Sequence, residues 1–365
     1  MTAAESKRML VELLKKAVEL GVSDIFLIAG FPVAFKLSGE IIPQSEKRLA
    51  PDETEALVFG LYELSGARSI ENYKASGDDD FSFSLPGVGR FRVSAYRQRG
   101  SCATVIRAVA FDLPDLATLN IPETVMGFTA MQKGLVLVTG PAGSGKSTTL
   151  SCMIDRMNHS YPYHIITIED PIEFLYRNDR CIISQREVSH DTESFDKALR
   201  YALRQSPNVI LVGEMRDLET ISIAMTAAET GQLIFSTLHT IGAAKSIDRI
   251  VDVFPSARQQ QIRVQLAMAL NAVVSQQLVP SVDGGLMPAF EIMVATPAIR
   301  SMIRENKVHQ INNAISTGAA CGMVTMDSSL VALYKSGRIT AETAEEHATD
   351  SAWIRDKLKK AAQTD

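Results

Sequence analysis

The sequence predicts an α/β protein in two parts: a small α+β domain with an antiparallel sheet, then a mostly parallel sheet covered by helices on both faces. Residues 80–85 and 90–96 alternate between apolar and polar side chains around a Pro-Gly-Val-Gly turn, which indicates a hairpin in the first part. Four short apolar runs separated by amphipathic helical stretches indicate buried parallel strands in the second. The 365 residues are enough for two or three domains with cores of their own.

The first part begins with an amphipathic helix. Residues 5–20 carry apolar side chains at i, i+3, i+4 spacing, and Gly21 ends this stretch. Two strands and the start of a second helix are expected next, at residues 24–28, 33–37 and from Pro51. We therefore expect residues 1–107 to form one domain and residues 108–118 to form a linker.

The second part, residues 119–365, has a different rhythm. Its apolar runs are too short for helices and lie at residues 135–138, 165–168, 209–212 and 233–235. From about residue 255 the pattern is helical with few strand signals. The expected second domain is therefore a parallel sheet followed by a helical C-terminal part.

A glycine-rich loop follows the first of these runs. Residues 140–148 read Gly-Pro-Ala-Gly-Ser-Gly-Lys-Ser-Thr and match the P-loop pattern G-x-x-x-x-G-K-[ST]. Backbone N–H groups of such a loop curl around phosphates, and the helix behind it adds its positive end. Lys146 would reach the β- and γ-phosphates, and Ser147 would supply a hydroxyl for Mg²⁺. The expected ligands are ATP and Mg²⁺, held by Gly140, Pro141, Ala142, Gly143, Ser144, Gly145, Lys146, Ser147 and Thr148. A glycine-rich turn that ends in Lys-Ser by chance is the alternative, and the strand before it and helix after it disfavour that.

Polar side chains follow the other three apolar runs. Glu169, Glu214 and His239 come after the second, third and fourth runs. Because ligands of open α/β sheets bind beyond the carboxyl ends of the strands, we expect these side chains to share one pocket. Phosphoryl transfer to water needs one carboxylate for the Mg²⁺ shell and one to position water. Glu214 holds the Walker B position and is the candidate metal residue with Ser147, whereas Glu169 is better placed to polarise water. The residues alone leave these two roles exchangeable, and His239 is a candidate γ-phosphate sensor.

Cations are scarce near the P-loop and frequent in the first part. Five arginines cluster between residues 90 and 107: Arg90, Arg92, Arg97, Arg99 and Arg107. They make either a solvated basic sheet face or arginine fingers for a neighbouring subunit's nucleotide. The second interpretation predicts an oligomer, since contact between subunits would then complete each site.

Composition excludes several other classes. The formal net charge of −5 and the absence of basic–aromatic stripes argue against nucleic acid as a partner. The four cysteines are far apart in the sequence and indicate reduced thiols in a protein that stays inside the cell. The sequence has no run of 18 apolar residues, so it predicts no transmembrane helix. Charged residues near the N-terminus also disfavour a signal peptide.

Four motifs together resemble a known family. Residues 140–148, 168–174, 210–217 and 236–240 are similar to the P-loop, Asp box, Walker B and His box of secretion-type traffic ATPases. Residues 297–305, Pro-Ala-Ile-Arg-Ser-Met-Ile-Arg-Glu, resemble the A-I-R-N-L-I-R-E motif of type IV pilus retraction ATPases within that superfamily. The resemblance runs from about residue 23 to residue 350.

The resemblance implies a RecA-like P-loop NTPase domain preceded by a small PAS-like α+β domain. It implies a cytoplasmic homohexamer with ATP between subunits, docked on an inner-membrane platform protein and acting indirectly on the pilin fibre in pilus retraction and twitching motility. Arg92, Arg99 and Arg107 are then the expected trans fingers, and Arg300 and Arg304 match the retraction motif. A pilus extension or type II secretion-type ATPase, an accessory retraction motor and a non-hydrolysing nucleotide-sensing ring stay open as alternatives.

Overall fold

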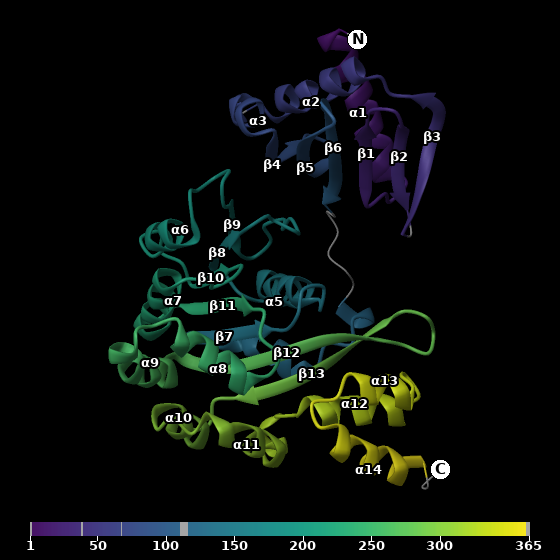
Figure 1. The fold of residues 1–365 in the computed structure, drawn as a ribbon. Coiled ribbons are helices and arrows are strands. Elements are labelled where there is room, and N and C mark those ends of the chain that lie inside the picture. The colour runs from purple at the N-terminus through teal and green to yellow at the C-terminus, as the bar shows by residue number, and fades with distance from the viewer. Residues whose placement is uncertain (1, 38, 67, 110–115, 363–365) are drawn as a thin grey trace. The chain divides into compact units, whose positions relative to one another are not determined.

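The computed structural model describes residues 2–37, 39–66, 68–109 and 116–362. The chain divides into two compact units, residues 1–112 with 173–175, and residues 113–172 with 176–365. Residues 110–115, the middle of the expected linker, lie outside the described residues. Mixed α/β architecture with a parallel sheet, as predicted, is confirmed (Figure 1).

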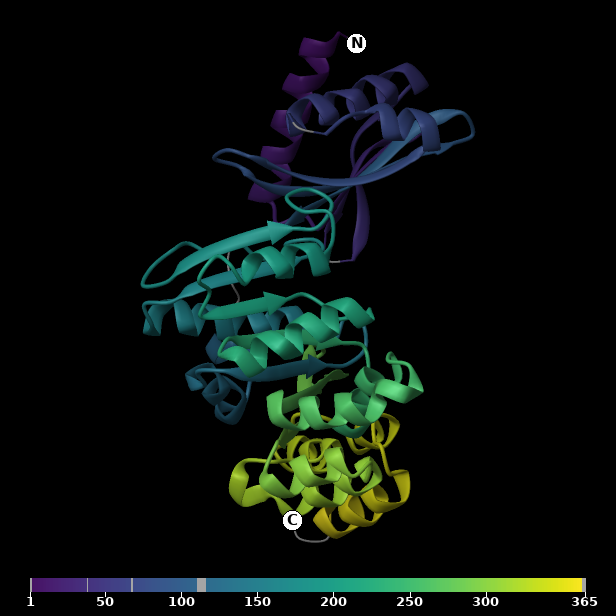
Figure 2. The same cartoon turned by 90° about the vertical axis from the view of Figure 1, so that its left-hand side faces the viewer.

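The first unit contains a six-stranded antiparallel sheet in the order β3-β2-β1-β6-β5-β4. Its elements are α1 (Ala3–Glu19), β1 (Asp24–Ile28), β2 (Pro32–Leu37), β3 (Glu40–Arg48), α2 (Pro51–Ser65), α3 (Glu71–Ser76), β4 (Asp78–Leu85), β5 (Gly89–Gln98) and β6 (Ser101–Val109). Helices α1 and α2 pack together on one face of the sheet, as Figure 2 shows. Leu10, Leu57 and Phe91 are fully buried in the core between them.

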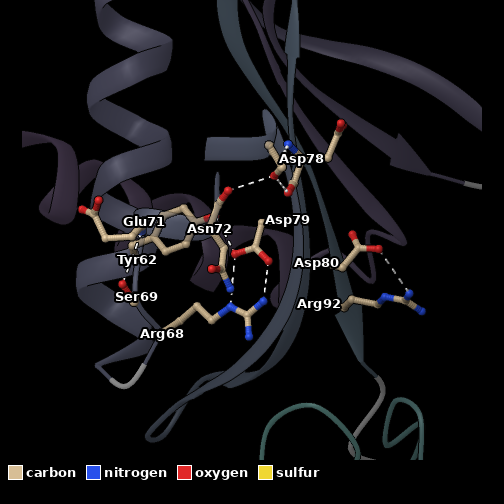
Figure 3. A network of polar contacts seen from close by, with 10 residues as sticks. Tyr62, Arg68, Ser69, Glu71, Asn72, Asp78, Asp79, Asp80 and Arg92 are labelled. Atoms are coloured by element: carbon tan, nitrogen blue, oxygen red, sulfur yellow. Dashed lines mark hydrogen bonds and ion pairs between the residues drawn. The ribbon is translucent and has the colours of Figure 1, made fainter. Parts of the chain in front are cut away.

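A buried ion pair fixes β4 to the chain that follows α2. Asp79 on β4 accepts hydrogen bonds from the Arg68 guanidinium and, at 2.9 Å, from the Tyr62 hydroxyl (Figure 3). The Asp79 side chain is 6% exposed, so both donors are needed to offset the loss of its hydration. The Tyr62 ring also packs on Phe81, with ring centroids 4.6 Å apart.

The second unit is built on a seven-stranded sheet in the order β13-β12-β7-β11-β10-β8-β9. Its first elements are α4 (Glu123–Gly127), β7 (Gly134–Thr139), α5 (Lys146–Ser160), β8 (His164–Glu169), β9 (Ile182–Glu187), α6 (Phe195–Ala202), β10 (Val209–Val212), α7 (Leu218–Thr230) and β11 (Leu233–Leu238). The remaining elements are α8 (Ala243–Asp252), α9 (Ser256–Ala269), β12 (Leu270–Pro280), β13 (Leu286–Val294), α10 (Pro297–Arg304), α11 (Ile311–Thr317), α12 (Met326–Lys335), α13 (Ala341–Glu346) and α14 (Ser351–Ala362). Strands β12, β7, β11, β10, β8 and β9 run parallel, and β13 runs antiparallel to β12.

Successive residues of the central strands enter two different cores. On β7, Leu135 and Leu137 face the core shared with α6 to α11, whereas Val136 and Val138 face the core shared with α4 and α5. Both faces of the strand are therefore buried, which explains why it reads as an unbroken apolar run. With both faces covered, the ends of the strands are where polar side chains can reach a ligand.

The helical pattern expected from about residue 255 is wrong for β12 and β13. Helix α9 ends at Ala269 and β12 begins at Leu270, with no glycine or proline to mark the change. The two strands form a long antiparallel hairpin, and β12 pairs with β7 along the strand that precedes the P-loop. This hairpin becomes one wall of the site described next.

Within the described part of the chain, none of the helices has the length and apolar character that crossing a bilayer requires.

Candidate nucleotide-binding site

The loop at residues 140–148 lies between a buried strand and the start of α5. Gly140, Gly143 and Gly145 have positive φ angles of 142°, 75° and 84°. A Cβ on Gly140 would lie 2.2 Å from the carbonyl oxygen of Gln276, so a side chain there would collide with β12. Backbone conformation therefore favours glycine at all three positions, and space also requires it at Gly140.

Lys146 is held inside this loop. Its Nζ donates hydrogen bonds to the carbonyl oxygens of Gly140 at 2.9 Å and Pro141 at 2.8 Å, and the residue is 8% exposed. The hydroxyls of Thr139 and Ser144 are buried in the described structure without a hydrogen-bond partner. A glycine cradle, a buried ammonium and unpaired hydroxyls fit the phosphates of a nucleotide. Ser147, on the first turn of α5, would present its hydroxyl to Mg²⁺.

Strand register brings the predicted strand-end residues to one edge of the sheet. Val212 of β10 pairs with Ile168 of β8 and with Ser236 of β11, and Leu238 of β11 pairs with Thr139 of β7. The residues after these pairs, Glu169, Gly213, His239 and Gly140, therefore leave the sheet at the same edge. Backbone hydrogen bonds connect neighbouring strand ends: Gly213 N–H donates to the Ile168 carbonyl at 2.8 Å, and Gly140 N–H donates to the Leu238 carbonyl at 3.2 Å.

Glu214 and His239, predicted separately, are in direct contact. The Nε2 of His239 lies 3.5 Å from Oε2 of Glu214, and the Nε of Arg216 lies 2.7 Å from the same oxygen. The Glu214 side chain is 14% exposed, whereas those of His239 and Arg216 are 54% and 72% exposed. A shielded carboxylate between an imidazole and a guanidinium is suited to hold a metal shell or orient water.

Arg216 is a residue that the sequence reasoning overlooked. The search for cations considered Lys146 alone near the P-loop, yet Arg216 follows Glu214 by two residues. Its position after a strand end was the available signal, because the chain has not yet entered α7 at that point. One guanidinium of the same chain therefore lies beside Glu214, so the site is less short of cations than its sequence indicates.

Glu169 ends β8 and is held from within the sheet. The Thr167 hydroxyl donates to its Oε1 at 2.6 Å, and the Gln185 amide on β9 approaches the same oxygen at 3.4 Å. Thr167 is fully buried and precedes Glu169 by two residues, so both side chains leave the same face of the strand. Two donors on one oxygen restrict the carboxylate to one orientation.

A cavity of about 210 Å³ lies beside the P-loop helix. Its lining comes from the chain before α4, from the start of α5 and from the β12–β13 hairpin: Thr118, Leu119, Asn120, Ile121, Gly145, Thr148, Thr149, Gln276, Leu278, Leu286 and Pro288. Gln276 belongs to this wall and binds α5 directly, since Thr149 donates to its Oε1 at 2.7 Å. Sequence reasoning missed Gln276 because it missed β12.

The predicted finger arginines lie on two neighbouring strands of the first unit and in the turn between them. Arg92 on β5 pairs across the sheet with Arg107 on β6, and Arg99 occupies the exposed turn between these strands. Arg107 donates to Asp24 at 2.9 Å, and Arg92 lies 3.8 Å from Asp80 (Figure 3). Two of the three thus have carboxylate partners within their own sheet.

The first arginine of the motif at residues 297–305 has a local structural role. Arg300 on α10 donates to the carbonyl oxygens of Ala267 at 2.6 Å and Met268 at 2.9 Å, which closes the C-terminal end of α9. Burial lowers the pKa of the Arg300 guanidinium, and the neighbouring Arg304 lowers it further. Arg304 itself is exposed.

Known proteins share both the sequence and the fold. Residues 2–364 match the family model described as type II/IV secretion system protein. The chain is 45% identical over 339 residues to the type IV pilus retraction ATPase PilT of Pseudomonas aeruginosa, covering 93% of this chain and 98% of that protein. It is 50% identical over 280 residues to a twitching motility protein of Neisseria gonorrhoeae, covering 76% of this chain and 75% of the relative.

A solved structure agrees with these relatives. The crystal structure of the pilus retraction motor PilT with bound ADP superposes with a TM-score of 0.87 at 44% identity, covering 94% of this chain and 98% of that one. The parallel sheet, the glycine cradle and the strand-end carboxylates define a P-loop nucleotide-binding protein. More particularly, the chain belongs to the family of type II/IV secretion system proteins.

Proposed function

We propose that this chain is an ATPase motor that drives the retraction of type IV pili and so supports twitching motility. The observation that carries the proposal is the placement of Glu214, shielded and in contact with His239, on the sheet edge that also carries the P-loop. A module that only binds nucleotide has no need of that carboxylate. Names of the two pilus relatives and the motif at residues 297–305 support retraction as the work performed.

The proposed chemistry is hydrolysis of the γ-phosphoryl group. Backbone N–H groups of the loop and Lys146 hold the phosphates and spread their charge. Ser147 and Glu214 would hold Mg²⁺, which would supply further neutralisation of the phosphate oxygens. Glu169, fixed by Thr167, orients the attacking water, and His239 contacts the γ-phosphate while touching Glu214. Each group acts on charge that develops in the transition state, which is where stabilisation accelerates a reaction.

The assembly we propose is a homohexamer with ATP between subunits. The second unit would be a RecA-like domain, and the first a PAS-like domain that delivers Arg92, Arg99 and Arg107 to a neighbour's nucleotide. The ring would work in the cytoplasm on an inner-membrane platform protein and turn pilin subunits out of the fibre. Close relatives of the chain are pilus motors, which supports this arrangement.

Phosphate release by purified protein tests the enzymatic part. With Mg²⁺ and ATP, the wild type should release phosphate steadily, and Glu214→Gln should lower kcat by about 10²–10⁴-fold because a neutral amide cannot replace the carboxylate. ADP should still bind, since Lys146 and the glycine loop are intact. Glu219→Gln on α7 is the matched control: this exposed glutamate pairs with Arg200 outside the site, so turnover should be unchanged. Equal turnover in Glu214→Gln and wild type contradicts the assignment.

The direction of the motor is tested in the source cell. Deleting the gene should leave surface fibres that accumulate and cells that no longer twitch. An extension motor predicts the reverse, loss of fibres, and an accessory retraction motor predicts near-normal fibre numbers. The deletion therefore separates the proposed function from the alternatives of the same superfamily.

A further inference from the structure

A buried carboxylate on β13 lies at the junction of two helices and takes no part in the chemistry above. Glu291 is 7% exposed, and its Oε1 accepts a hydrogen bond from the backbone N–H of Ala243 at 2.8 Å. The backbone N–H of Met326 lies close enough to this carboxyl to lower its pKa. Ala243 begins α8 and Met326 begins α12, so one side chain lies at the N-termini of two helices that both contact β13 (Figure 1).

The first of these helices continues directly from the His239 segment. Three residues, Thr240 to Gly242, separate His239 from α8. Ser275 is the cross-strand partner of Glu291 on β12, and its Oγ accepts a hydrogen bond from the Gly242 N–H at 2.9 Å. Consecutive backbone amides of this short loop are thus bound by neighbouring side chains of the β12–β13 hairpin.

The cross-strand row that contains Glu291 and Ser275 continues to β7, next to the P-loop. Ser275 pairs with Thr139 of β7, the residue immediately before Gly140. The next residue of β12, Gln276, accepts the hydrogen bond from Thr149 on α5. Glu291 and Ser275 therefore hold the His239 loop against the strand row that also fixes the P-loop.

On its other side, Glu291 reaches the C-terminal helices. Asp327 follows Met326, is 8% exposed and accepts hydrogen bonds from the backbone N–H groups of Thr349 at 2.6 Å and Asp350 at 2.9 Å. These two residues lead into α14. Two buried carboxylates in succession thus connect the His239 loop with α12 and α12 with α14.

Burying the Glu291 carboxylate costs free energy of folding unless hydrogen bonds compensate for its lost hydration. Burial raises the pKa of the Glu291 carboxyl, and the nearby Asp327 raises it further, whereas the N–H groups of Ala243 and Met326 lower it. A carboxylate offers acceptor oxygens to both amides and no competing donor, whereas an apolar residue would leave the Ala243 N–H unpaired. Hydrogen-bond acceptance, rather than side-chain packing, therefore explains a glutamate at this position.

We propose that Glu291 is a positioning residue: it clamps the His239 loop to the C-terminal helices α12 to α14 and thereby holds His239 in place for ATP turnover. The inference rests on the proposed ATPase function and gives Glu291 no contact with nucleotide. Movement of the His239 loop would reach the C-terminal helices through this side chain.

Glu291→Gln in the full chain tests the clamp. Glutamine keeps the size and one acceptor but turns an NH₂ group toward the second N–H. We expect kcat for ATP to fall by roughly tenfold or more while the Kd for ADP stays within about twofold. Amide hydrogen exchange in peptides covering residues 240–246 and 325–330 should accelerate by about tenfold. Ser329→Ala is the matched control, because the Ser329 hydroxyl accepts a hydrogen bond from the Phe290 N–H at 3.1 Å, one residue before Glu291 and away from the loop.

Three results would overturn the proposal: unchanged kcat in Glu291→Gln, unchanged exchange in both peptides, or an equal loss of kcat in Ser329→Ala. If Glu291→Gln does not fold, Ser275→Ala removes only the Gly242 contact and should still lower kcat and accelerate exchange in residues 240–246, each several-fold; no change in either refutes the clamp. A wild type that releases no phosphate refutes the ATPase function instead, and the exchange measurement then decides the clamp alone.

Discussion

The two sheets of this chain use their polar side chains in different ways. In the antiparallel sheet of the first unit, charged residues stand along the strands and pair within the unit: Arg107 with Asp24, and Asp79 with Arg68. In the parallel sheet of the second unit, charged and polar groups gather after the strands end. The difference follows from layering, because helices cover one face of the first sheet and both faces of the second.

This contrast shows at which positions a polar residue in the sequence is good evidence for a functional site. A polar residue along a half-covered strand has two explanations, since both solvation and ion pairing place it there. A polar residue at the carboxyl end of a doubly covered parallel strand has fewer, since the ligand of an open α/β sheet binds there. The strand-end predictions for Glu214 and His239 accordingly converge on one contact, whereas the roles of the arginines stay predictions.

The largest expected effect is a loss of turnover when a predicted finger arginine is removed. Such a loss would give the first sheet a catalytic role and contradict the contrast between the two sheets. If Arg99 is a trans finger, Arg99→Ala lowers kcat by about 10³–10⁵-fold and leaves nucleotide binding intact. Arg107→Ala should lower kcat similarly and also destabilise the first unit, because Asp24, with a side chain only 7% exposed, loses its cation. Steady-state phosphate release and thermal unfolding measure the two effects.

Arg8→Ala supplies the control for these variants. Arg8 is an exposed arginine on α1 that pairs with Glu12, and its loss should change neither turnover nor stability measurably. Full turnover in both Arg99→Ala and Arg107→Ala defeats the finger assignment and leaves these arginines as parts of the sheet.

A smaller effect would sharpen the contrast by showing that the polar network of the first unit serves stability. Burial, with the hydrogen bond to Asp79, raises the pKa of the Tyr62 phenol above its ordinary value of 10.0. The unfolded chain then loses this proton at a lower pH than the folded chain. Its contribution to stability is therefore fully present below pH 10 and is lost as the pH rises further, by at most about 1.4 kcal/mol for each pH unit.

Thermal unfolding between about pH 9 and pH 11 measures this slope. Tyr62→Phe should be less stable at pH 9, since Asp79 loses a donor, and should lose less further stability toward pH 11 than the wild type. Tyr201→Phe, on a tyrosine that is 61% exposed, should keep the wild-type slope. Parallel curves for wild type and Tyr62→Phe would show that the buried phenol does not govern the pH dependence.

How much of the molecule the sequence reveals depends on how each element is marked. β7 and the P-loop are marked twice, by a continuous apolar run and by glycines whose positive φ angles the loop requires. β12 carries no mark at its start, because the helix before it ends without a break. β9 was missed for another reason: it is an edge strand whose last four residues, Ser184 to Glu187, are polar.

The same holds for the site. Glu169, Glu214 and His239 were predictable because each follows an apolar strand. Gln276 and Glu291 were not, because both lie within strands that had no signal, and their importance comes from pairing across the sheet with residues far away in sequence. Contacts of that kind appear only once the register is known.

The two arginines of the short helix α10 have different surroundings: Arg300 binds the end of α9, whereas Arg304 is exposed. The planar guanidinium of Arg300 donates to two main-chain oxygens of α9 and to the Asn271 side chain. The ammonium group of a lysine could not reach all three acceptors with the same geometry. Arg304, one turn later, projects into water. A lysine in place of Arg300 would therefore weaken the link between α10 and the end of α9, whereas a lysine in place of Arg304 would keep the positive charge at this exposed position.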